Sequence, residues 1–257
     1  MEASPAPSSS VASGAKLGTV EILRRYPFKG MAGEDLREVY VTYAGMAGDR
    51  AYAFIDPTNP ANFPWLTGRL QREMILFRPR FVAPPDPADP HPPENHFRLE
   101  VVTPEGRTLS VDDPAFTPFF EKRFGRKLEL RFSERAMHDA CPLSLLGLNS
   151  LQFLSQETGL ELDRRRFRAN FYVRWESREP FYENELVGAK LRIGEKLTVM
   201  VVKKDARCVI ITLDPSTAEV SHKVFEVVAR NHVSCLGVYA SVLREGIVRA
   251  GDPIYAI

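Results

Sequence analysis

Apolar and polar residues alternate in short stretches along most of this chain. Within residues 97–102 every second side chain is apolar, which is the period of a half-buried strand. Residues 103–106 contain a proline and end in glycine, and a second alternating stretch follows over 108–111. The pattern therefore predicts a β-hairpin at this point of the chain.

The other predicted strands share β-branched or aromatic side chains and are separated by breaks that contain glycine. They are Thr19–Arg24, Val39–Tyr43 and Ala51–Ile55 in the first half, and Asn170–Val173, Lys190–Ile193, Leu197–Val202, Val209–Leu213, Gly237–Leu243, Ile247-Val248 and Pro253–Ala256 in the second. The segment Gly194-Glu195-Lys196 is predicted to be a hairpin turn.

One longer helix is predicted to begin near Ser144, which would serve as its N-cap. Leucines recur after it with helical spacing, and Gly159 is a suitable residue for the C-terminal end. The leucines of this stripe are Leu145, Leu148, Leu151 and Leu154. A shorter helix is expected over residues 224–229.

Together these elements predict a mainly β protein, a β-rich α+β fold with barrel-like sheets and few helices. Residues 1–15 are rich in Ala, Ser and Pro and are expected to form a disordered tail. Residues 83–95 contain six prolines, a density that predicts an exposed loop. A domain boundary is placed near residue 135, which gives a first domain over 16–135 and a second over 136–257.

Composition and charge narrow the function classes. The formal net charge is +1 over 257 residues, which argues against bulk electrostatic binding of nucleic acid or anionic membranes. No apolar run approaches the roughly 20 residues that a membrane-spanning helix needs. Three dispersed cysteines without a CxxC pair form neither a disulfide framework nor a zinc motif, so a reducing, cytoplasmic location is expected.

The first candidate for chemistry is Cys208, which follows Arg207 and precedes an apolar segment. A neighbouring guanidinium favours the thiolate, the form that binds metals. Cysteine is also among the most frequently buried residues, so Cys208 taken alone is more typical of a packed core position.

Two groups of cations are the next candidates. Arg168 and Asn170 belong to a segment with four arginines in five positions (Arg164, Arg165, Arg166 and Arg168), which suits bidentate binding of an anion or, alternatively, a solvated charged loop. Lys29, Arg50 and Arg69 each lie beside a glycine, in Tyr26-Pro27-Phe28-Lys29-Gly30, Gly48-Asp49-Arg50 and Thr67-Gly68-Arg69. Each of these three is singly more typical of a surface charge.

In their order and in their amino-acid sequence, these segments resemble the motifs of the MOSC superfamily, specifically the branch with the mitochondrial amidoxime-reducing component and its bacterial relatives. The resemblance covers nearly all of the chain after the tail. It is carried by Tyr26–Gly30, Gly48–Arg50, the segment His138-Asp139-Ala140-Cys141-Pro142, Arg166–Asn170, Ala206–Glu219 and the closing Gly246–Asp252.

The resemblance implies an N-terminal β-barrel domain and a C-terminal MOSC β-barrel domain, with the molybdenum cofactor (Mo-molybdopterin) bound between them. It implies that Cys208 is the protein ligand of molybdenum, and a soft thiolate suits a metal already bound by the soft sulfurs of the pterin dithiolene. The cofactor-binding set expected from the resemblance is Lys29, Gly30, Arg50, Arg69, Cys141, Arg168, Asn170, Arg207 and Cys208.

The sequence departs from the family pattern at several positions. Gly30 stands where serine is common, Ile211 replaces the first of two threonines, and Ala218 replaces a glycine. Cys141 occupies a position where a small hydroxyl residue is frequent, so it is either a second thiol near the site or a packed small residue. Cys235 belongs to no motif.

The resemblance implies an oxidoreductase that reduces N-hydroxylated or other N-oxygenated small molecules. Asp214 is the candidate for a catalytic acid beside Cys208, with Asp139 a second candidate. Because the iron–sulfur domain of some bacterial relatives does not follow, electrons are expected from a separate protein.

Two alternative functions stay open. One is a carrier of molybdenum cofactor or sulfur, as for MOSC domains fused to cofactor sulfurases; this sequence shows no pyridoxal-phosphate-binding, aminotransferase-like domain. The other is a relative of the same fold that has lost the cofactor.

Overall fold

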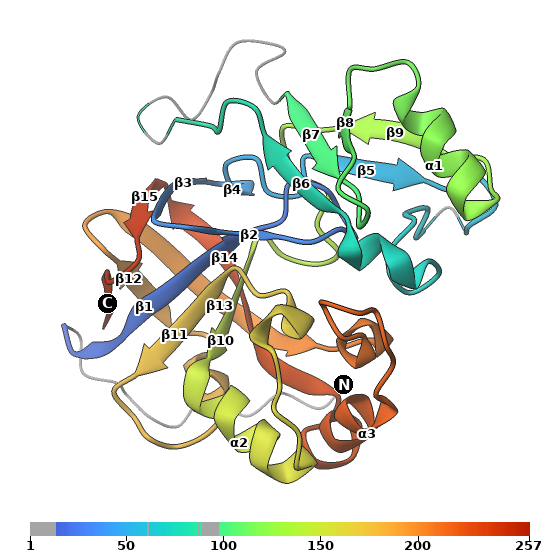
Figure 1. Ribbon diagram of the computed structural model, residues 1–257. Coiled ribbons are helices and arrows are strands. Elements are labelled where there is room, and N and C mark those ends of the chain that lie inside the picture. The colour runs from blue at the N-terminus through green and yellow to red at the C-terminus, as the bar shows by residue number, and fades with distance from the viewer. Residues whose placement is uncertain (1–13, 61, 87, 89–97) are drawn as a thin grey trace.

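A closed β-barrel and a smaller second lobe make up the structure, a computed structural model that describes residues 14–60, 62–86, 88 and 98–257 (Figure 1). The predicted tail therefore lies almost wholly outside the described residues, as does much of the proline-rich segment over 83–95. Within the described part no helix is long and apolar enough to cross a membrane.

The barrel has seven strands, joined in the order β11-β10-β14-β13-β12-β16-β1 and closed by pairing of β1 with β11. All neighbours are antiparallel except β10 and β11, which are parallel. The strands are β1 (Lys16–Arg25), β10 (Leu143–Gly147), β11 (Phe171–Trp175), β12 (Lys190–Ile193), β13 (Leu197–Ala206), β14 (Cys235–Arg244) and β16 (Pro253–Ala256). Their inward-facing apolar side chains form one buried core.

Two helices, α2 (Leu148–Thr158) and α3 (His222–Asn231), pack outside the barrel over a second apolar core. The helix predicted from Ser144 is therefore wrong at its start, because β10 extends to Gly147 and α2 begins at Leu148. Every residue of β10 is buried, and periodicity alone does not separate a fully buried strand from a buried helix. Gly159 ends α2 in the left-handed conformation, as predicted.

The predicted strand over Val209–Leu213 is also wrong. Residues Val209–Thr212 form the 3₁₀ helix η4, which the Thr212 hydroxyl supports by donating a hydrogen bond to the Val209 carbonyl. The β-branched side chains that suggested a strand cover the α2–α3 core instead, where Ile211 is buried. Two further 3₁₀ helices lie nearby, η2 (Arg164–Phe167) and η3 (Tyr182–Leu186).

The second lobe consists of two small sheets and a helix, drawn at the upper right of Figure 1. One sheet pairs β5 (Tyr52–Ile55) with β9 (Glu129–Phe132), and the other runs β6 (Arg78–Phe81), β7 (Leu99–Val102) and β8 (Thr108–Ser110). The predicted hairpin corresponds to β7 and β8. The core of the second lobe is filled by phenylalanines from α1 (Phe116–Phe124), and η1 (Arg72–Leu76) lies beside them.

A third small sheet lies beside the barrel: β15 (Gly246–Arg249), β3 (Glu38–Thr42) and β4 (Gly45–Met46). β2 (Glu34–Leu36) extends the edge of β1. The mainly β prediction is confirmed. The division of the chain near residue 135 stays a prediction. β1 precedes residue 135 in the sequence, yet it is a strand of the barrel whose other strands all follow residue 135.

Candidate functional site

A cavity of about 290 Å³ lies where the barrel faces the second lobe. Its wall is built from segments far apart in sequence: the loops after β1, before β5 and before η1 on one side, and the ends of β13 and η2 on the other. The predicted site residues that line it are Lys29, Gly30, Arg50, Arg69, Cys141, Arg168, Asn170, Arg207 and Cys208. Asp214 does not line it.

Cys208 is partly exposed at the second position after β13 and directly precedes η4. The adjacent Arg207 fixes this turn. Its Nε donates a hydrogen bond of 2.7 Å to the Leu236 carbonyl, its Nη1 donates one of 2.6 Å to the Phe167 carbonyl, and its Nη2 pairs with Asp205 at 2.7 Å. Arg207 thus positions the segment that carries Cys208, and its N–H groups are hydrogen-bonded to other groups of the protein.

Two glycines allow close approaches around the site. Gly237 has φ +78°, and a Cβ there would lie 2.6 Å from the Leu145 carbonyl oxygen and 3.3 Å from Nη2 of Arg207. Gly30 has φ +86°, and a Cβ there would lie 3.1 Å from the Cα of Thr67. Serine rarely adopts such a φ, so this loop conformation accounts for glycine at position 30.

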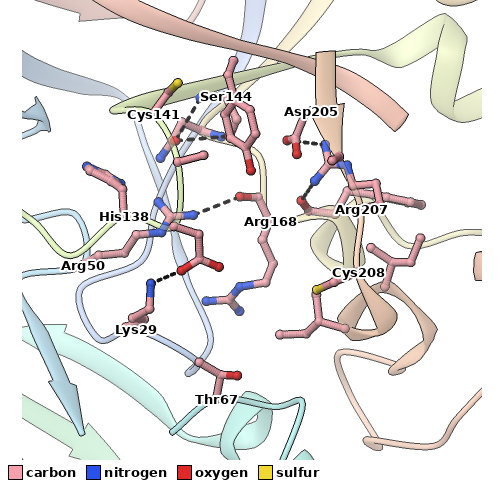
Figure 2. Close-up of a pocket in the computed structure, with 18 of the residues that line it drawn as sticks. Lys29, Arg50, Thr67, His138, Cys141, Ser144, Arg168, Asp205, Arg207 and Cys208 are labelled. Carbon is pink, nitrogen blue, oxygen red and sulfur yellow. Dashed lines mark hydrogen bonds and ion pairs between the residues drawn. The ribbon is translucent and has the colours of Figure 1, made fainter. Parts of the chain in front are cut away.

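Lys29 and Asp139 form an ion pair at the cavity wall (Figure 2). Lys29 is 4% exposed and also donates a hydrogen bond of 2.6 Å to the Met137 carbonyl. Burial lowers the pKa of Lys29, opposed by Asp139. The pKa of Asp139 is lowered as well: burial raises it, but Lys29 and Arg69 outweigh that effect. Arg69 contacts the same carboxylate at 3.3 Å, so two cations share one acid.

Arg50 is paired with the fully buried carboxylate of Asp49. Asn170 holds this carboxylate from the other side through Nδ2 at 3.1 Å, and its Oδ1 accepts hydrogen bonds from the amide and hydroxyl of Ser144. The amide of Asn170 is therefore used inside the protein. It positions the Asp49–Arg50 pair, and the direct cofactor contact expected from the sequence stays a prediction.

Arg168 differs from the other buried cations because no carboxylate among the described residues lies within ion-pair distance of it. Its Nη1 donates a hydrogen bond of 2.8 Å to the Met31 carbonyl, and its guanidinium stacks over the Tyr26 ring at 4.4 Å. Burial lowers the pKa of Arg168 to about 10, with Tyr26 opposing and Arg50 and Arg24 adding to the effect. In Figure 2 the guanidinium reaches into the space between Lys29 and Cys208.

Several lining residues were not predicted. Lys203, Lys204 and Asp205 come from the last residues of β13, Tyr239 from β14, and His138 from the segment before β10. His138 is buried, its Nε2 donates a hydrogen bond of 2.9 Å to the Ala44 carbonyl, and burial lowers its pKa. The proximity of Lys203–Asp205 to Cys208 in sequence was the available signal for three of them.

The remaining residues singled out in the sequence lie at different places in the structure. Cys141 lines the cavity on a different side from Cys208, and burial raises its pKa (Figure 2). Cys235 is a free cysteine in β14 outside the cavity lining. The carboxylate of Asp214 pairs with Arg166 at 2.7 Å and caps the following turn by accepting from the Ser216 amide. The structure thus places Asp214 away from the site for which it was proposed.

Protein ligands alone do not form a metal centre in the part of the chain that the structure describes, where no cluster of three or more His, Cys, Asp or Glu occurs. What the cavity offers is two partly exposed thiols, of Cys208 and Cys141, a partly buried guanidinium without an acid partner, and cations held on its opposite wall. This donor set suits a large anionic ligand that brings its own metal ligands.

Comparison with known proteins finds one family model that matches part of the chain. Residues 133–255 match the family model of the MOSC domain, so this part of the chain is similar to MOSC domains. MOSC domains are associated with the molybdenum cofactor. No curated protein matches the sequence.

One solved structure shows the same fold, and a second is similar over part of its length. The YuaD protein from Bacillus subtilis is similar over 93% of this chain and 95% of its own, with a TM-score of 0.51 and 13% identity. YiiM from Escherichia coli is similar over 95% of this chain and 70% of its own, with a TM-score of 0.41 and 10% identity.

Proposed function

We propose that this protein is a molybdenum-cofactor-dependent oxidoreductase that reduces N-hydroxylated compounds, with Cys208 as the protein ligand of the metal. One observation carries the proposal. The partly exposed thiol of Cys208 shares a single cavity with Arg168, whose partly buried guanidinium has no carboxylate partner among the described residues. A metal-binding sulfur and an unsatisfied anion site therefore face the same space.

The residues present fit the proposed cofactor. Its phosphate and dithiolene are anionic, so Arg168 would bind it, with Lys29 and Arg50 as further hydrogen-bond donors on the facing wall. Cys208 would complete the metal coordination. When bound, the cofactor supplies two-electron redox chemistry at molybdenum.

The protein's own part in the reaction is to bind, orient and provide protons. Reduction of an N-hydroxylated compound takes two electrons and two protons, breaks the N–O bond and releases the amine or amidine and water. Among the proton-bearing groups that line the cavity are the Lys29 ammonium, whose pKa is lowered by burial, and His138. Asp139 keeps the ammonium in place through their ion pair.

The electrons are proposed to come from a separate donor protein. The three cysteines, none of them in a disulfide, are consistent with a reducing compartment such as the cytoplasm, which we propose as its location.

The test is reduction of benzamidoxime to benzamidine by the cofactor-loaded protein with a chemically reduced viologen as donor. Turnover in the wild type and its loss in Cys208→Ser are expected, whereas Cys235→Ser, outside the cavity, retains turnover. A loaded protein that transfers its cofactor to an apo-enzyme but reduces no N-hydroxylated compound would instead be a carrier, and would contradict the proposal.

A further inference from the structure

The cations that line the cavity fall into two groups when each is matched to its partner. Lys29 and Arg69 share the Asp139 carboxylate, Arg50 is paired with Asp49, and Arg207 with Asp205. Arg50 and Arg207 are each compensated by one carboxylate and add little net attraction for a further anion, whereas Lys29 and Arg69 share one carboxylate and leave one positive charge on the facing wall. The cations of the lining without any carboxylate within ion-pair distance, in the part of the chain that the structure describes, are Arg168, Lys203 and Lys204.

These three cations lie at different depths. Arg168 is partly buried and is the one assigned above to the cofactor. Lys203 and Lys204 are exposed yet line the same cavity, which places them at its mouth. The Lys203 ammonium lies 5.9 Å from the ring centre of Tyr239, so the aromatic face holds it over the opening.

The charge of Lys203 acts on the cavity. Lys203 lowers the pKa of Cys141, another lining residue, although burial of that thiol outweighs the effect. The acids that line the cavity are Asp205 and Asp139, and both are paired with other cations. The mouth therefore carries two positive charges that the protein leaves unopposed.

We propose that Lys203 and Lys204 bind an anionic group of the substrate, so that the preferred substrates are N-hydroxylated compounds that also carry a carboxylate or similar anion. This inference rests on the proposed function and names the substrate class of the same site. A cationic or neutral N-hydroxylated compound gains nothing from the pair, whereas an anionic one is attracted to the mouth and held there.

The experiment compares benzamidoxime with 4-carboxybenzamidoxime, which differ by one carboxylate. The cofactor-loaded wild type is expected to show a kcat/KM for the carboxylate compound higher by roughly tenfold at low salt, a preference that declines as salt screens the charges. In the double variant Lys203→Gln/Lys204→Gln the ratio is expected to fall to about one. The charge-reversed Lys203→Glu/Lys204→Glu protein should prefer the neutral compound.

The matched control removes two lysines away from the cavity. Lys122 and Lys127 are both exposed on the second lobe and absent from the cavity lining, and Lys122→Gln/Lys127→Gln should retain the wild-type preference. This control separates local binding from a general effect of net charge.

A second readout is independent of turnover. Titration of the loaded protein with 4-carboxybenzamidine and benzamidine, which cannot be reduced at an N–O bond, should show tighter binding of the carboxylate compound in the wild type and equal binding in the double glutamine variant. Equal kcat/KM for the two amidoximes in the wild type, or a preference that survives in the double variant, would overturn the inference. Absence of any amidoxime reduction would contradict the proposed function, and the titration would still decide the role of the lysines.

Discussion

Nη1 of Arg207 donates a hydrogen bond of 2.6 Å to the carbonyl oxygen of Phe167, and so ties the cysteine-bearing segment to η2. The same guanidinium pairs with Asp205, whose side chain is 2% exposed. One residue thereby sets the position of Cys208 relative to Arg168, the next residue after Phe167. This relationship, and not the thiolate-stabilising effect expected from sequence, is the role of Arg207 that the geometry supports.

Arg207→Gln is expected to lower the free energy of unfolding by about 3–5 kcal/mol, because it leaves the buried Asp205 carboxylate without its counter-ion. Urea denaturation of the apo-protein measures this loss. Removing both charges in Arg207→Gln/Asp205→Asn should restore part of the stability. Equal losses in the single and double variants would show that the ion pair is not the cause.

Arg168→Gln should separate stability from cofactor binding. Removing a buried cation that lies close to Arg50 and Arg24 leaves the apo-protein as stable as the wild type or more stable, whereas bound molybdenum and pterin fall. Arg166→Gln is the matched control, because Arg166 is paired with Asp214 outside the cavity, and it should lose about 1–3 kcal/mol of stability. A large loss of stability in Arg168→Gln would contradict the assignment of Arg168 to an anionic ligand.

Much of the site was predictable because its residues lie just after the ends of strands. Lys29 and Gly30 follow the end of β1, and Cys208 follows the end of β13, where the strand pattern stops and polar residues begin. The barrel brings such loops together because neighbouring strands end at the same rim. The order of motifs along the sequence therefore carried information on the cavity.

What the sequence did not show depends on partners distant in the chain. The Asn170 amide is typical of a ligand-binding group, but contacts with Ser144 and Asp49 occupy it. Lys203 and Lys204 follow the predicted strand Leu197–Val202 and become part of the cavity because β13 extends to Ala206. The helix α1 has phenylalanines at 116, 120 and 124, a helical spacing that the strand-dominated pattern around it obscured.

His138 gives the apo-protein a defined pH dependence. Burial holds its pKa below the usual 6.5, so the unfolded chain binds the proton more strongly than the folded one. Stability contributed by neutral His138 is therefore present above pH 6.5 and is lost as the pH falls below it, by at most about 1.4 kcal/mol for each pH unit. Urea denaturation at pH 7 and 5 should show a smaller decline in His138→Gln. An equal decline in both proteins would contradict this assignment.

The second lobe depends on its phenylalanine core. Phe120 is fully buried, and its ring centroid lies 5.0 Å from those of Phe54, Phe77 and Phe116. Phe120→Ala is expected to cost about 3–5 kcal/mol of unfolding free energy, measured by urea denaturation. Phe153, which is 37% exposed on α2, serves as the control, and Phe153→Ala should cost clearly less. Comparable losses at the two positions would contradict the packing described for this lobe.

The most direct test of the central claim is the molybdenum and pterin content of protein produced in a host that makes the cofactor. The account predicts one molybdenum and one pterin per chain in the wild type, in Cys141→Ser and in Cys235→Ser, and loss of the metal in Cys208→Ser while the fold, followed by circular dichroism, is unchanged. Well-folded wild-type protein without molybdenum, or a Cys208→Ser protein that retains it in full, would contradict the assignment of Cys208 as the metal ligand.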